Sequence, residues 1–184
     1  IILGVAAFNS IGAPPELGLV FPLIARAIGV LASIVGVFAV KASDKYKSGL
    51  APIRRGFITA GILTLLGTAA VAFTYVGDKG EGGGHEGLKV FLAVAAGLVL
   101  AQIVSYLTEY FTSTETAPVR EIAASARTGP ATTVLSGISS GLESSVWAII
   151  AIAGSLGVAI ALGGGNVLFS LYLVALTGMG MLAT

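Results

Sequence analysis

The chain has 184 residues, of which 55% are hydrophobic and 10% are charged, and its formal net charge is +1. Because a soluble domain carries about 25% charged residues, this composition excludes an ordinary soluble protein and indicates one that lies in a membrane. The small net charge gives no reason to expect a nucleic-acid partner, and the absence of cysteine excludes disulfides and cysteine catalysis.

Long apolar runs separated by short loops follow one another along the sequence. A helix rises about 1.5 Å per residue, so about twenty apolar residues cross the ~30 Å hydrocarbon layer. Within that layer every backbone polar group must be paired inside the segment, which favours helices. We therefore predict an all-α, polytopic transmembrane bundle of about five spans. The spans are expected at 21–40, 57–76, 88–111, 132–162 and 166–184.

The two ends of the chain and its glycines add to this interpretation. Residues 1–10 resemble the end of a truncated helix, and the sequence also stops within an apolar run. We therefore expect an internal piece of a longer polypeptide. The 26 glycines are explained by helix packing, because helices in lipid approach one another through small residues.

Charges in the loops predict the orientation of the spans. The loop 41–55 carries five cations against one acid, and the loop 113–131 carries two arginines, whereas the loop 77–87 has one Lys and three acids. Since cytoplasmic loops are enriched in Lys and Arg, we expect 41–55 and 113–131 to face the cytoplasm. The loops 11–19, 77–87 and 163–165 would then face outside.

A short stretch of the 113–131 loop has helical character. Residues 119–126 lie between Pro118 and the pair Gly129-Pro130, and they contain none of the residues that break helices. We predict a short helix here, at the membrane interface between two spans.

Glu143 is the most informative single residue. It lies about eleven residues into the fourth predicted span, roughly 16 Å from the cytoplasmic end and therefore near the bilayer centre. A carboxylate at that depth is costly, so an intramembrane Glu is a candidate functional residue by default. Two interpretations remain open. Glu143 either belongs to an ion pathway, or it serves helix packing with hydrogen bonds from neighbouring serines, which are Ser139, Ser140, Ser144 and Ser145.

Motifs for soluble enzyme chemistry are missing from the sequence. It contains no HExxH motif and no GxxxxGK[ST] phosphate loop, and His85 is the only histidine. The glycine-rich stretch 80–84 is interpreted as a loop outside the membrane. We therefore predict no catalytic residue and no metal ligand within this chain.

Several blocks of the sequence resemble one known family. These blocks are Thr-Glu-Tyr-Phe-Thr at 108–112, Pro118-Val119, Ala-Arg-Thr-Gly at 126–129, and Gly-Leu-Glu-Ser at 141–144. Their order and separation resemble those of the membrane-integral pyrophosphatases, and the resemblance covers essentially the whole chain.

The resemblance implies a multi-pass protein of the cell membrane, an inorganic pyrophosphatase that couples hydrolysis of diphosphate to proton or sodium transport. Such a pump uses Mg²⁺ on its diphosphate substrate and forms homodimers. None of the family's substrate or Mg²⁺ ligands maps onto this chain, so we expect a scaffold segment that packs against the remaining helices and is inactive alone. The K⁺ requirement stays open. The alternative is part of a secondary transporter or channel with Glu143 as its coupling site.

Overall fold

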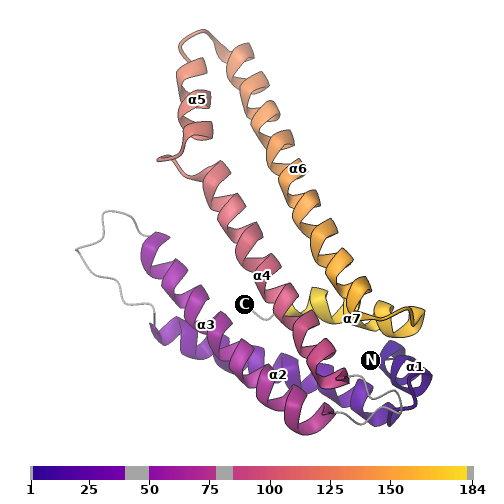
Figure 1. Cartoon of the computed structure of the whole chain (residues 1–184). Coiled ribbons are helices and arrows are strands. Elements are labelled where there is room, and N and C mark those ends of the chain that lie inside the picture. The colour runs from indigo at the N-terminus through magenta and orange to yellow at the C-terminus, as the bar shows by residue number, and fades with distance from the viewer. Residues whose placement is uncertain (1, 40–49, 78–84, 182–184) are drawn as a thin grey trace. The chain divides into compact units, whose positions relative to one another are not determined.

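The computed structural model of the chain describes residues 2–39, 50–77 and 85–181, and these residues form helices joined by short connections, without any strand. Four of the helices are long and apolar enough to cross a membrane, and a fifth apolar helix is shorter. The prediction of an all-α, polytopic helical protein is therefore confirmed. In chain order (Figure 1) the elements are α1 Ile2–Ser10, α2 Pro15–Ala39, α3 Leu50–Val71, the π-helix η1 Ala72–Val76, α4 Glu86–Thr112, α5 Ala117–Ser125, α6 Pro130–Leu162 and α7 Val167–Met181.

Two helices begin earlier than the apolar runs suggest. Helix α2 begins at Pro15 and not at residue 21, since a proline at the first helical position has its φ already fixed near the helical value. Helix α3 begins at Leu50, so the part 50–55 of the predicted loop 41–55 is helical. The expected loop boundaries were wrong at both places. The remainder of that loop, and residues 78–84 of the loop 77–87, lie outside the described residues.

The chain divides into two compact units. The first unit comprises Ile1–Val99 and Ser155–Thr184, and the second comprises Leu100–Gly154. The long helices α4 and α6 each contribute to both units.

An aromatic cluster forms part of the core of the first unit. The ring of Phe8 on α1 packs edge-on against Tyr172 and Phe169 of α7, with centroid separations of 5.5 and 6.1 Å. All three side chains are at most 2% exposed. Near the cluster, Asn166 Nδ2 donates a hydrogen bond to the Ser10 carbonyl oxygen at 3.3 Å. The start of α7 is thereby held against the end of α1.

Glycines allow direct backbone contact between helices of the first unit. A Cβ on Gly4 of α1 would overlap the carbonyl oxygen of Gly18 on α2, and a Cβ on Gly18 would overlap the carbonyl oxygen of Gly4. A similar contact joins α4 and α7, where a Cβ on Gly97 would overlap the Thr177 carbonyl oxygen. Small residues therefore mark helix contacts in this unit, as the composition predicted.

The second unit is a helical hairpin with a short helix at its turn. The predicted short helix within the 113–131 loop is confirmed as α5, which begins with Pro at its second position after the extended residue Thr116. At its far end, Thr132 Oγ1 of α6 donates to the Ser125 carbonyl oxygen at 3.1 Å. This bond connects the end of α5 to the first turn of α6, and it fixes the turn that leads into the long helix.

Candidate functional site: a pocket lined by serines and two glutamates

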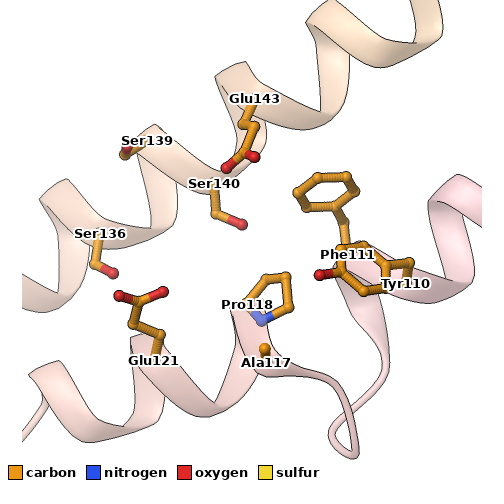
Figure 2. A pocket seen from close by; sticks show the side chains of 9 residues that line it. All are labelled: Tyr110, Phe111, Ala117, Pro118, Glu121, Ser136, Ser139, Ser140 and Glu143. Atoms are coloured by element: carbon orange, nitrogen blue, oxygen red, sulfur yellow. The ribbon is translucent and has the colours of Figure 1, made fainter.

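A pocket of about 320 Å³ lies within the second unit (Figure 2). The end of α4, the start of α5 and the N-terminal half of α6 surround it. The lining consists of Tyr110, Phe111, Ala117, Pro118, Glu121, Ser136, Ser139, Ser140 and Glu143. The structure therefore brings Glu143 together with the Tyr-Phe pair of the TEYFT block and with α5.

The polar side chains of the pocket come from three helices, because Tyr110 belongs to α4, Glu121 to α5, and the serines and Glu143 to α6. Figure 2 shows Glu121 of α5 pointing toward Ser136 of α6, while Glu143 points from α6 into the space beside Phe111. Both carboxylates are exposed, and the lining contains no Lys or Arg. Carboxylate, serine and tyrosine oxygens are hydrogen-bond acceptors, so the pocket suits water, hydrogen-bond donors or a positively charged group.

Ser145 does not support Glu143 in the way the sequence suggested. Its hydroxyl donates to the Gly141 carbonyl oxygen at 3.0 Å, within its own helix. Neither it nor Ser144 lines the pocket, whereas Ser139 and Ser140 do. Ser139 and Ser140 therefore share the pocket with Glu143, and a hydrogen bond from either serine to Glu143 stays a prediction.

The pocket offers no cage for a divalent metal. No group of three or more His, Cys, Asp or Glu side chains comes together in the part of the chain that the structure describes. Hydrated Mg²⁺ is bound in proteins through one or two carboxylates and the oxygens of a phosphate substrate. Glu121 and Glu143 stand on different helices of an exposed pocket that has no basic residue to hold a phosphate. We therefore derive no hydrolytic step through these residues.

Sequence reasoning missed Glu86, which it counted among the acids of an outside loop. In the structure Glu86 is the first residue of α4, its side chain is only 5% exposed, and its Oε2 atom has no hydrogen-bond partner among the residues that the structure describes. The only signal in the sequence is its position directly before the apolar run. That position predicts a helix N-terminus, where an acidic side chain is favourable, but it does not predict burial.

Comparison with known proteins places the chain in a family. The family model described as "Inorganic H+ pyrophosphatase" matches residues 1–184. A "K(+)-insensitive pyrophosphate-energized proton pump" of Streptomyces coelicolor is 40% identical over 197 residues, which cover 100% of this chain and 24% of that protein. A "Pyrophosphate-energized proton pump 2" of Mycoplana dimorpha is 36% identical over 140 residues, which cover 74% of this chain and 67% of that protein.

A further relative comes from Clostridium tetani, and its name describes a putative K⁺-stimulated pyrophosphate-energized sodium pump. It is 37% identical over 171 residues, which cover 91% of this chain and 24% of that protein. The chain thus spans about a quarter of the length of the first relatives that it matches. With a family match over its full length and four helices able to cross a bilayer, this chain is a multi-pass membrane segment that belongs to the inorganic H+ pyrophosphatase family.

Proposed function

We propose that this chain is a middle transmembrane portion of an ion pump, which couples hydrolysis of inorganic diphosphate to proton or sodium transport. The family match over all 184 residues is the observation that carries the proposal. The relatives named as proton and sodium pumps support both choices of ion. The expected alternative, a secondary transporter or channel, is not favoured by these names.

Within the pump, the chain acts mainly as a scaffold. The first unit has helices in backbone contact at Gly4 and Gly18 and at Gly97 and Thr177, and such contacts make a rigid support. Family membership supports a dependence on divalent metal, which we assign to Mg²⁺ bound with the diphosphate. The metal neutralises phosphate charge when bound, and its protein ligands belong to the remaining parts of the pump. We expect no hydrolysis by this segment alone.

The length of α6 changes the depth that we assign to Glu143. Helix α6 has 33 residues and is therefore about 50 Å long, whereas the hydrocarbon layer is only ~30 Å thick. Residues 146–162 contain no charged side chain, and the serines and Glu143 precede them. The apolar part therefore occupies the hydrocarbon, and Glu143 lies near the cytoplasmic boundary, not at the bilayer centre.

At that boundary, a role of Glu143 in the contact between helices fits better than a role as an ion relay at the bilayer centre. The pocket opens where the charge bias of the loops places the cytoplasm, so water reaches both glutamates. The exposed apolar side chains of α6, such as Leu142, Val146 and Ile149, are covered by lipid and by the remaining helices of the same pump. A homodimer contact is part of this proposal and is supported only by the resemblance to the family.

Hydrolysis by the full-length parent tests the proposal. Membranes that contain the parent are supplied with diphosphate and Mg²⁺, and phosphate release is measured together with acidification or sodium uptake by the vesicles. The segment expressed alone is the matched control. Hydrolysis and transport by the parent, with neither by the segment, support the pump. An intact, folded parent that does not hydrolyse diphosphate contradicts the pump. That result would favour the alternative, a secondary transporter or channel with Glu143 as its coupling site.

A further inference from the structure

Glu86 is a buried carboxylate that the scaffold role does not explain. Its side chain is 5% exposed, and its Oε2 atom is buried without any hydrogen-bond partner. Leaving a charged oxygen unpaired in a protein interior is strongly unfavourable. The buried oxygen therefore calls for a partner that the described residues do not provide.

The start of α4 packs directly on the end of the π-helix η1. Gly87 N–H donates to the Gly77 carbonyl oxygen at 3.0 Å, and a Cβ on Gly87 would lie 2.7 Å from the Ala72 carbonyl oxygen. Gly77 itself has a φ of +51°, a conformation that favours glycine. Glu86 thus stands where the N-terminus of α4 meets the C-terminus of η1.

The two helix ends leave the charge of Glu86 uncompensated. A helix N-terminus carries about half a positive charge and a helix C-terminus about half a negative charge. Since α4 begins and η1 ends at the same place, their contributions largely cancel. Lys89, one turn along α4, lies with its Nζ 6.0 Å from the centroid of the Phe169 ring on α7. Lys89 is thereby placed against α7.

We propose that Glu86 binds a small monovalent cation the size of sodium at this end of the bundle. The single carboxylate favours one positive charge, and backbone carbonyls at helix C-termini are known ligands of Na⁺ in membrane transport proteins. A water molecule would satisfy the hydrogen bonding but would leave the charge unbalanced.

The site lies at the end of the bundle that faces outside, if the charge bias of the loops sets the orientation. It is distinct from the pocket near Glu143, which belongs to the second unit. The proposal goes beyond the pump function and does not depend on it, because a cation bound at Glu86 stabilises the fold whether or not diphosphate drives transport.

Thermal unfolding of the full-length pump in lipid nanodiscs tests the site. Sodium chloride is titrated against choline chloride at constant ionic strength, and the shift in Tm is recorded. We expect sodium to raise the Tm of the wild type in a saturable manner, as any ligand that binds only the folded state does. Glu86→Gln should lose this shift. Glu16→Gln is the matched control, since Glu16 lies in the first turn of α2 but is exposed, and it should keep the shift.

A second variant keeps the test decisive if Glu86→Gln does not fold. Glu86→Asp retains the charge but withdraws the carboxylate by one methylene, so the sodium concentration for a half-maximal Tm shift should rise. An unchanged titration in Glu86→Asp, or an equal sodium shift in Glu86→Gln, would overturn the proposal. So would a wild type whose Tm responds to neither Li⁺, Na⁺ nor K⁺. Diphosphate hydrolysis, measured separately, decides the pump function.

Discussion

The hydroxyl of Tyr172 on α7 donates a hydrogen bond to the carbonyl oxygen of Gly18 on α2, at 3.2 Å and in the buried core. Within α2 this carbonyl would normally accept from the N–H four residues later, but that residue is Pro22, which has no N–H. Tyr172 therefore supplies the partner that the proline removes. The hydrogen bond joins residues that are 154 positions apart in the sequence. It lets α7 compensate for the backbone hydrogen bond that Pro22 removes from α2.

Removing that hydroxyl should destabilise the protein. Tyr172→Phe leaves the buried Gly18 carbonyl oxygen without a donor, which costs about 1–3 kcal/mol. We expect a lower Tm or a shorter half-life on heating of the full-length pump. In a Pro22→Ala background the N–H of residue 22 satisfies Gly18, so Tyr172→Phe should cost less there.

The matched control is Tyr106→Phe, because Tyr106 is 62% exposed in this structure. It should change the Tm little. Equal losses from Tyr172→Phe with and without Pro22 would show that the hydroxyl does not substitute for the missing N–H.

The contact between Gly4 and Gly18 should tolerate no side chain. A Cβ at position 18 would overlap the Gly4 carbonyl oxygen and lie 2.6 Å from the Phe8 Cδ2 atom, so α1 and α2 must separate to accept it. Overpacking of this kind costs about 1–3 kcal/mol or more, and we expect Gly18→Ala to lower the yield and the Tm of the folded pump. Gly178→Ala serves as the control, since nothing lies within 4 Å of the position that its Cβ would take. Similar losses in both variants would contradict a specific contact at Gly18.

The sequence predicted the helices well, because a run of twenty apolar residues leaves few structures possible in lipid. It also indicated that the glycines pack helices, but it did not pair Gly4 with Gly18, since pairing depends on how α1 and α2 cross. The burial of Glu86 was missed for the same reason. Its environment arises from the meeting of η1 and α4, and no local pattern records that contact. The depth of Glu143 stays a prediction, because the length of α6 alone does not say which part of the helix lies in the hydrocarbon.

Neutralising Glu143 should affect assembly or stability more than catalysis. Glu143 lines an exposed pocket and does not belong to a metal-binding group among the described residues, so we expect Glu143→Gln to keep the rate of diphosphate hydrolysis within about twofold. A twofold change in rate corresponds to about 0.4 kcal/mol of activation free energy. Glu121→Gln, on the facing helix, is the comparison. A large loss of ion transport with intact hydrolysis would instead identify Glu143 as a coupling residue.

The depth of Glu143 in the membrane can be measured by labelling. This chain has no cysteine, so a single cysteine is introduced into a cysteine-free parent and treated with a maleimide that cannot cross the bilayer. Because α6 is longer than the hydrocarbon layer is thick, Glu143→Cys should react from the cytoplasmic side. Ile150→Cys should remain unlabelled, since seven residues place it about 10 Å deeper on nearly the same helix face. Labelling of Glu143→Cys only from outside would reverse the topology. If neither cysteine is labelled, Glu143 lies in the bilayer interior, where an unpaired carboxylate requires an ion or a proton as its partner.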